Sequence, residues 1–296
     1  MWLLSVVLVW GLNKLAAKVL LESLSPLAVF TAQMMGVALL LCLVVVCRRQ
    51  RLCDWGAMLG AVALSGLLFL GQRLLFFAGQ KLTTVSQGTL FMDTSPLWTA
   101  LIVAALGIEV IRWRNWLGVA LGLGGVALVL FGGSQAASQY APAPLLGNLI
   151  LASSAILLAV HMVVTRGWMQ RFGALRVMAM THVAALIYVL PWGAPALART
   201  EWASLSALQY WLLAYTIVLA GAYGFVAWYG VIRRTSAARV AAYQFAMPVV
   251  SALGAILLLG EHLAPWQILG FVVALLGVYL ARPAPRAKPA APDAGA

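Results

Sequence analysis

Three charged side chains lie inside apolar segments of this 296-residue chain that are long enough to cross a membrane: Lys14, Arg73 and Asp93. An ionisable group at such a position costs about 2.5–3.5 kcal/mol on insertion scales, so it is a candidate for function. A buried aspartate alone tends to bind a proton, whereas an aspartate beside a cation stays charged. We therefore predict an Arg73–Asp93 or a Lys14–Asp93 pair that opens when a substrate or a proton arrives. The alternatives are a static ion pair that holds helices together, and an Arg73 that extends its guanidinium to the outer surface.

Uncharged polar and aromatic side chains could line the same site. Asn13, Gln72 and Gln87 lie at about the depth of the three charged residues. Trp10 shares one helix face with Asn13 and Lys14, because residues three and four positions apart are neighbours on a helix. Binding pockets combine apolar walls with a few polar groups. Trp10 could therefore form an aromatic wall beside an amphipathic solute, or it could simply pack against other helices.

A second polar layer is expected nearer the cytoplasm, in the other half of the chain. It consists of His161, His182, Tyr243 and Gln244. Histidine titrates near neutral pH and therefore suits a proton relay, while hydrogen-bonded helix packing is the alternative at both histidine positions. The two histidines do not share one helix at a metal-binding spacing, so we predict no metal and no cofactor.

The elements that must position these residues are apolar helices. Hydrophobic residues make up 64% of the chain and charged residues 9%, and the mean hydropathy is +0.99, whereas soluble domains have roughly 45–50% apolar and about 25% charged residues. A spanning helix needs about 20 apolar residues, and barrel strands would alternate polar and apolar residues. The sequence therefore predicts an all-α integral membrane protein with ten transmembrane helices. They are expected at residues 2–20, 27–47, 56–78, 83–105, 113–131, 145–165, 176–193, 207–230, 237–258 and 266–281.

The formal charge of +12 could suggest nucleic-acid binding, but the placement of the 19 basic residues indicates membrane topology instead. If the N-terminus is cytoplasmic, most of them fall in inner loops and in the C-terminal tail, while the outer side holds only Lys18, Lys81 and Arg199. This bias predicts a multi-pass protein of a bacterial inner membrane with both termini in the cytoplasm. We expect membrane lipid and a small-molecule substrate as partners and no nucleic acid, with a homodimer open as an alternative to a monomer.

The chain contains an internal duplication, in which residues 96–128 align without a gap to residues 248–280. Five apolar segments per half mean that the halves enter the membrane in opposite senses, and such inverted repeats recur in secondary transporters. We predict two inverted five-helix repeats, 1–131 and 145–281, an extracytoplasmic linker at 132–144, and a disordered cytoplasmic Pro/Ala-rich tail at 282–296. The pairs that carry the alignment are Pro96 with Pro248, Glu109 with Glu261, Gly118 with Gly270, and Gly125 with Gly277.

These features resemble the drug/metabolite transporter superfamily, in its EamA-type branch. The first segment reads WGLNKLAAK from Trp10 to Lys18, similar to the start of that branch, and each half carries the branch's proline, glutamate turn and glycine-rich last helix. The second helix of such proteins often carries a basic residue where this chain has Gln33, which places Gln33 in the candidate site. The resemblance implies a secondary carrier and leaves the cargo open, because the family carries very different substrates.

Prolines, glutamates and glycines at matched positions have mainly structural interpretations. Glu109 and Glu261 precede the last helix of each half, near helix N-termini where a carboxylate is favoured by about 0.3–1 kcal/mol. We interpret both as turn residues, and Pro265 fits the first turn of the helix that follows. Pro96 and Pro248 are expected to loosen the fourth and ninth helices. The glycines of the fifth and tenth helices favour close packing in a peripheral scaffold.

The function predicted from these observations is secondary active transport. We expect export of a small metabolite, such as an amino acid or a drug-like solute, by alternating access between the repeats, with coupling to protons or to exchange. The GxxxxGK[ST] stretch of ATP-binding loops does not occur in the sequence. One alternative is an integral-membrane enzyme that acts on a lipid-linked substrate, although the seven acidic residues are scattered singly. A membrane scaffold or receptor is the other alternative, and the inverted duplication favours a carrier over it.

Overall fold

The computed structural model describes the whole chain except residues 1, 53–54, 109–112, 132–140, 233–245 and 281–296. Glu109, Tyr243, Gln244, most of the predicted linker and the predicted tail therefore lie outside the described residues. The helices of the first half are α1 (Trp2–Ser23), α2 (Pro26–Cys47), α3 (Trp55–Leu82), α4 (Val85–Met92), α5 (Ser95–Ala105) and α6 (Trp113–Phe131). Those of the second half are α7 (Pro144–Phe172), α8 (Ala174–Ala198), η1 (Trp202–Ser204), α9 (Ala207–Tyr215), η2 (Thr216–Tyr223), α10 (Gly224–Ile232), α12 (Ala246–Leu259) and α13 (Pro265–Leu280).

Short polar side chains start several of these helices. Ser25 precedes α2, and its Oγ accepts a hydrogen bond from Ala28 N at 3.1 Å. Ser206 and Gln209 form a reciprocal capping box at the start of α9. Such caps satisfy N–H groups that the first turn of a helix leaves without a partner. Inside a membrane this matters more, because no bulk water is available to bind those groups.

The fourth apolar segment was predicted as one continuous helix, and the structure corrects this: it breaks into α4 and α5 at Asp93 and Thr94. Pro96 lies in the first turn of α5 and lacks the N–H that would continue the helix. Asp93 is the C-cap of α4, and Thr94 Oγ1 donates a hydrogen bond to Phe91 O at 2.6 Å. Asp93 therefore lies at a helix break and not near the middle of a helix. Pro96 was expected to loosen this helix, and the structure shows that the helix is interrupted between Met92 and Ser95.

The eighth apolar segment also departs from a regular α-helix. Helix α9 passes into the π-helix η2, and η2 passes into α10. A π-helix shifts the backbone hydrogen-bond register and is frequently found at functional sites. The carbonyl oxygens of Thr216 and Ala220 in η2 accept hydrogen bonds from side chains of the first half. The irregular segment of the second half is thus held directly by the first half.

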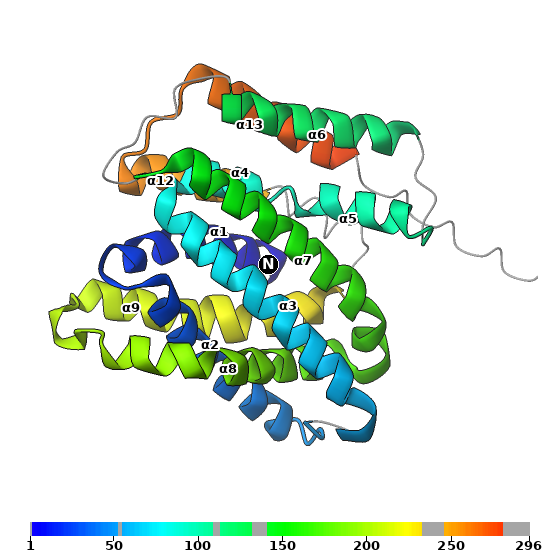
Figure 1. Cartoon of the computed structure of the whole chain (residues 1–296), viewed down its shortest axis with the longest axis vertical. Helices are drawn as coiled ribbons and strands as arrows, with labels where there is room; N and C mark the ends of the chain where they lie inside the picture. The colour runs from blue at the N-terminus through cyan, green and yellow to red at the C-terminus, as the bar shows by residue number, and fades with distance from the viewer. Residues whose placement is uncertain (1, 53–54, 109–112, 132–140, 233–245, 281–296) are drawn as a thin grey trace, which may run out of the picture.

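The contacts between the two halves occur in matched pairs. Helices α1 and α7 are the first helices of the two halves, and each packs against two segments of the other half. Helix α7 packs along α3, and α1 packs along the corresponding segment made of α9, η2 and α10. Likewise, α7 packs on α4 and α5, and α1 packs on α12. Helices α2 and α8 pack together, as do α6 and α13 (Figure 1). Two structural repeats related by a pseudo-two-fold axis make contacts of this reciprocal kind. Within the described residues, six helical segments are long and apolar enough to cross a membrane, namely α1, α2, α3, α7, α8 and the segment from α9 into α10.

Helices α6 and α13 lie side by side at one edge of the molecule (Figure 1), where a peripheral scaffold was expected. Their backbones touch. A Cβ added to Gly277 would lie 2.1 Å from Gly122 N, and a Cβ added to Gly125 would lie 2.4 Å from Ala274 N. Small residues are therefore required here, because any side chain would push the two backbones apart.

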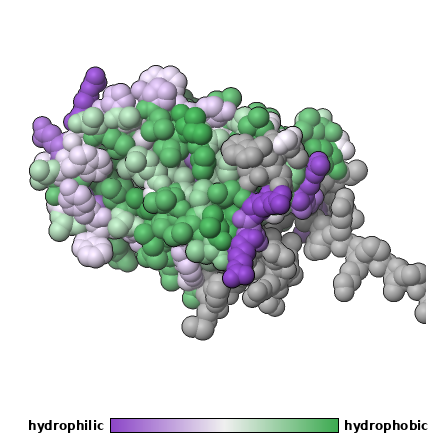
Figure 2. Space-filling model, turned by 90° about the horizontal axis from the view of Figure 1, so that it is seen from below, coloured by the Kyte–Doolittle hydropathy of each residue, from purple (hydrophilic) through white to green (hydrophobic). Residues whose placement is uncertain are grey.

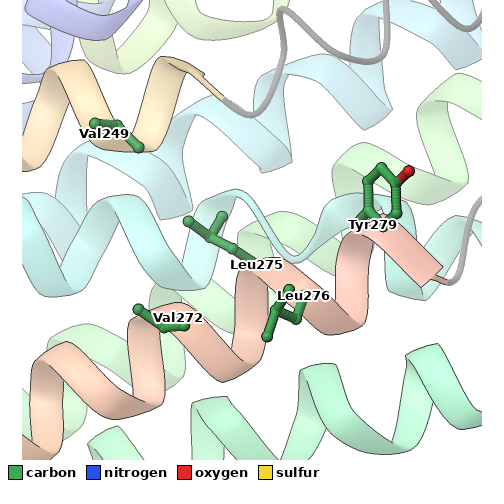
Figure 3. Close-up of a pocket in the computed structure, with 5 residues that line it drawn as sticks. All are labelled: Val249, Val272, Leu275, Leu276 and Tyr279. Atoms are coloured by element: carbon green, nitrogen blue, oxygen red, sulfur yellow. The ribbon is translucent and has the colours of Figure 1, made fainter.

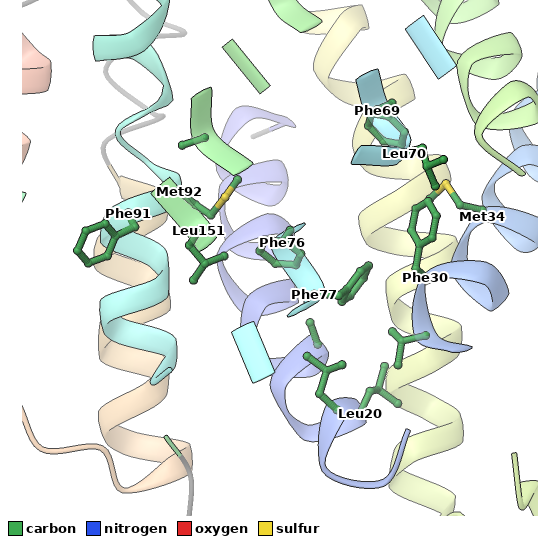
Figure 4. Packing of buried hydrophobic residues seen from close by; sticks show 14 of the residues in the cluster. Leu20, Phe30, Met34, Phe69, Leu70, Phe76, Phe77, Phe91, Met92 and Leu151 are labelled. Atoms are coloured by element: carbon green, nitrogen blue, oxygen red, sulfur yellow. The ribbon is translucent and has the colours of Figure 1, made fainter. Parts of the chain in front are cut away.

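Apolar side chains fill the interior and also cover the outside. Figure 4 shows the buried cluster, in which Phe30 of α2 and Phe77 of α3 have ring centroids 6.3 Å apart. Hydrophobic side chains also cover most of the face shown in Figure 2, and Leu39 and Leu257 are 70% and 78% exposed. A surface this apolar suits contact with lipid, because exposed patches of this extent are rare on soluble proteins.

Candidate functional site

One of the two predicted ion pairs is present. Lys14 Nζ of α1 donates hydrogen bonds to both carboxylate oxygens of Asp93, at 3.0 Å and 2.9 Å. In the part of the chain that the structure describes, this is the one ion pair. The two side chains are 14% and 27% exposed, so the pair is reachable and not sealed in the core. The break between α4 and α5 thus presents a carboxylate that α1 neutralises.

Trp10 and Asn13 occupy the same helix as Lys14 but have separate surroundings. Trp10 Nε1 donates a hydrogen bond to Ala220 O of η2 at 2.8 Å. Its ring packs against Phe225 and Trp228, with centroids 5.7 Å and 5.3 Å away. Trp10 is therefore anchored to the second half by its polar edge and its ring. Asn13 Oδ1 is buried without a hydrogen-bond partner.

Arg73 does not pair with Asp93 as the other predicted pair required. Its Nη2 donates a hydrogen bond to Gln33 Oε1 of α2 at 2.5 Å. The guanidinium carbon lies 5.0 Å and 4.9 Å from the ring centroids of Phe76 and Phe77, so the group is held inside the bundle and does not extend to the outer surface. Gln33 Nε2 in turn donates to Thr216 O of η2 at 3.3 Å. The π-helix, Gln33 and Arg73 therefore form one connected chain of contacts.

Gln72 and Gln87 are used to join helices. Gln72 Nε2 donates to Ser154 Oγ of α7 at 3.1 Å, and that hydroxyl donates to Gln72 O at 2.8 Å. Gln87 Oε1 of α4 accepts a hydrogen bond from Asn148 Nδ2 of α7 at 2.7 Å. These buried amides satisfy polar groups between the two halves. Among the described residues, neither amide forms a hydrogen bond with the charged side chains with which it was grouped.

The two histidines form a separate layer around one phenylalanine of α3. Phe69 has ring centroids 5.6 Å from His161 and 4.7 Å from His182. His161 Nε2 lies 3.2 Å from Ser65 Oγ, and His182 Nδ1 lies 2.8 Å from Met178 O. Both imidazoles are buried and have local partners, an arrangement that suits packing and leaves their predicted role in proton transfer a prediction. Helix α3 connects the layers, because Phe69 and Arg73 share one face.

Lys18 was expected on the outer side of the membrane, which remains a prediction, and the structure adds a contact that the sequence did not indicate. It belongs to α1 and is buried, and its Nζ donates to Gln80 O at 3.0 Å and to Thr83 O at 2.6 Å. These carbonyls belong to the end of α3, where the last turn leaves acceptors free and a cation is favoured. Sequence reasoning missed this role because the long lysine stem reaches a helix end that only the fold places nearby.

Glu261 was expected to serve the start of its own last helix, and the structure assigns it to another one. Its carboxylate oxygens accept hydrogen bonds from Val85 N at 2.5 Å and Ser86 N at 3.0 Å, in the first turn of α4. The start of α13 is instead satisfied by Gln267, whose Oε1 accepts from Ala264 N at 2.9 Å. Pro265 occupies the first position of α13, as predicted. The structural interpretation of Glu261 fits these contacts, but the helix that it caps lies in the other half.

A groove on the outside of the second half is lined almost entirely by carbon (Figure 3). Val249 of α12 and Val272, Leu275, Leu276 and Tyr279 of α13 enclose a volume of about 330 Å³. Solute sites combine apolar walls with several placed polar groups, which this groove lacks. We regard it as part of the lipid-facing surface.

The sequence profile of the EamA-like transporter family matches the chain twice, at residues 1–131 and 145–282. This chain belongs to the EamA-like transporter family. It is 26% identical over 301 residues to the uncharacterised inner membrane transporter YedA of Escherichia coli, covering 99% of this chain and 95% of YedA. It is 24% identical to the uncharacterised transporter sll0355 of Synechocystis, covering 92% of this chain and 86% of that protein. One solved crystal structure superposes with a TM-score of 0.64 at 18% identity, over 95% of this chain and 94% of the other.

These matches confirm the resemblance and the predicted fold class. This EamA-like chain is an all-helical, multi-pass membrane protein of ten helices, built from two halves consistent with inverted repeats. It is a transporter and not an enzyme, so the alternative of a membrane enzyme falls away. The solved structure supports the fold alone, and the substrate and the residues that bind it are left to the chemistry of the site.

Proposed function

We propose that this EamA-like chain exports a small metabolite, such as an amino acid or a drug-like solute, by alternating access between its two halves. The proposal places it in a bacterial inner membrane with both termini in the cytoplasm, because basic residues are concentrated on the side that contains them. Coupling to protons or to exchange belongs to the same proposal. The observation that carries it is the Lys14–Asp93 pair at the break between α4 and α5.

That pair has the properties expected of a carrier site. Discontinuous helices line the midplane sites of many secondary transporters, because their free backbone groups and end charges bind solutes and ions. Lys14 comes from α1 and Asp93 from the end of α4, and each of these helices packs against the second half. A rocking motion between the halves would therefore act on the two partners through different neighbours. A proton or a cationic group of the substrate that takes the place of Lys14 keeps Asp93 neutralised and releases the Lys14 ammonium.

The π-helix supports movement at the same level. Its eight residues have hydrogen bonds in a register that can revert to that of an α-helix, and such segments recur at functional sites. Trp10 and Gln33 hold two of its carbonyl groups from the first half. A change in the hydrogen-bond register of η2 would therefore move the carbonyl groups that Trp10 of α1 and Gln33 of α2 bind. This gives the alternating-access proposal a candidate hinge.

Untargeted mass spectrometry of the medium tests the proposal. Cells that produce the wild-type protein, Asp93→Asn or Glu201→Gln at equal membrane levels are compared with cells that produce none. Glu201 is exposed in the turn after α8, so Glu201→Gln makes a similar chemical change away from the site. We expect at least one solute to accumulate outside with the wild type and with Glu201→Gln, and to fall to the background level with Asp93→Asn.

The pH of the medium separates proton coupling from exchange. Export driven by inward proton flow slows in the wild type when the medium is made alkaline, and any residual export by Asp93→Asn should lack that dependence if Asp93 takes up the proton. Equal export and an equal pH profile for Asp93→Asn would remove Asp93 from the coupling step. Media that match between producing and non-producing cells would overturn export as the function.

A further inference from the structure

Arg73 is a half-buried cation that lacks an anionic partner among the described residues. Among the residues that the structure describes, no carboxylate lies within 4.0 Å of its guanidinium, and Gln33 Oε1 is its hydrogen-bond acceptor. Its Nε is buried without a partner. Arginine remains protonated in proteins and carries several N–H donors in one plane. The Nε edge of this fork is thus buried without an acceptor.

The other two membrane-embedded cations of the first half are matched. Lys14 pairs with Asp93, and Lys18 donates to the carbonyls at the end of α3. A charge inside the membrane is costly unless it is paired, so the missing partner of Arg73 is best supplied from outside the chain. We infer that Arg73 binds the carboxylate of the transported solute. This inference rests on the proposed transport function and names the substrate class for it.

The surroundings define the rest of the solute. Phe69 and Phe77 lie four residues before and after Arg73, on the same face of α3. Phe76 and Phe77 lie next to each other (Figure 4), with ring centroids 5.2 Å apart. The ring centroids of Phe76 and Phe77 lie 5.0 Å and 4.9 Å from the guanidinium carbon. Because these rings lie against the guanidinium, we expect an acceptor to approach its N–H groups along the edge of the plane. A planar carboxylate fits that edge with two parallel hydrogen bonds. The apolar body of the solute then lies against the phenylalanine rings.

Charge balance favours a monocarboxylate over a phosphate. One guanidinium neutralises one negative charge, whereas a phosphate monoester carries nearly two at neutral pH. A second cation for a phosphate would have to come from Lys14 or Lys18, and both are already engaged. The inferred substrate is therefore an amphipathic monocarboxylate. An amino acid with a large apolar side chain belongs to this class.

Binding to the purified full-length protein tests the inference without transport. The probe is radiolabelled 3-phenylpropionate, and its neutral amide, 3-phenylpropionamide, is the matched competitor of the same shape. We expect saturable binding of the acid to the wild type and no competition by the amide. Arg73→Gln should lose roughly tenfold or more in affinity, because hydrogen bonds to charged groups are each worth about 1.5–3 kcal/mol. Arg199→Gln, which changes an exposed arginine at the end of α8, should bind as the wild type does.

The comparison of acid and amide uses only the wild type, so it stands even if Arg73→Gln fails to fold. Absence of saturable binding at millimolar acid, equal competition by the amide, or full affinity in Arg73→Gln would each overturn the inference. The whole-cell experiment reports separately on transport. A solute without a carboxylate that Arg73→Gln exports normally would leave the proposed function standing and remove the inference. Binding of the acid to Arg73 without export of any solute would support the carboxylate site and overturn the proposed export function.

Discussion

Glu261 offers the sharpest test of how the two halves are joined. Its carboxylate accepts the N–H groups of Val85 and Ser86, which are both fully buried residues. A buried N–H left without an acceptor costs about 1–3 kcal/mol, so Glu261→Ala should destabilise the protein by about 2–6 kcal/mol. Glu261→Gln retains one acceptor oxygen and removes the charge that the helix start favours. We expect it to cost about 1–3 kcal/mol, near half of the alanine effect.

The assay is unfolding of the purified protein by sodium dodecyl sulfate in mixed micelles, followed by circular dichroism. Hydrogen exchange of the peptide that contains Val85 and Ser86 locates the effect, because the first turn of α4 should exchange faster in both variants. Glu201→Gln is the control, since its carboxylate is exposed and provides no side-chain cap. If Glu261→Gln and Glu201→Gln unfold alike and exchange at α4 is unchanged, the carboxylate does not stabilise α4 and the reasoning fails.

Two further predictions concern the scaffold and the ion pair. Gly277→Ala should destabilise the contact of α6 with α13 by about 1–3 kcal/mol through overpacking, because the new Cβ would meet Gly122 N. Gly124→Ala is the matched control, since nothing lies within 4 Å of a Cβ added there. Equal unfolding of the two variants would contradict the close packing of α6 and α13. Lys14→Met should lower stability by about 1–3 kcal/mol, less than for a fully buried pair because both partners are partly exposed. Combining it with Asp93→Asn should recover most of that loss in the same unfolding assay, and strictly additive losses would show that the pair is not coupled.

The sequence could predict the helices because their signal is local. Apolar length and the proline positions belong to single segments, and together with the internal duplication they predicted a fold of ten helices in two halves. The Lys14–Asp93 pair was also within reach, because two charges of opposite sign in neighbouring apolar segments must find each other at low dielectric. The break at Asp93 was foreseen only as a weakening, since Pro96 alone does not reveal whether its neighbours will straighten or interrupt a helix.

The remaining features depend on contacts across the molecule. Nothing near Glu261 in the chain points to Val85, and nothing near Lys18 points to Thr83, because those partners are backbone groups of distant turns. The π-helix carries no composition that separates it from an α-helix. Arg73 was predicted from its charge inside an apolar segment, whereas its neighbour Gln33 came from family resemblance, as periodicity gives no sign that an amide of α2 would face it.

The cap that Glu261 places on α4 also bears on how such a protein could have arisen. Each half of an inverted duplication looks like a complete unit, but here the first turn of α4 is finished by a turn from the opposite half. A first half on its own would lack that acceptor, much as one subunit of an obligate dimer lacks its partner's surface. The two halves are therefore best viewed as fused subunits, and selection on one constrains the other through a single carboxylate. Once the copies were joined in one chain, each was free to lose the symmetry that two identical subunits must keep.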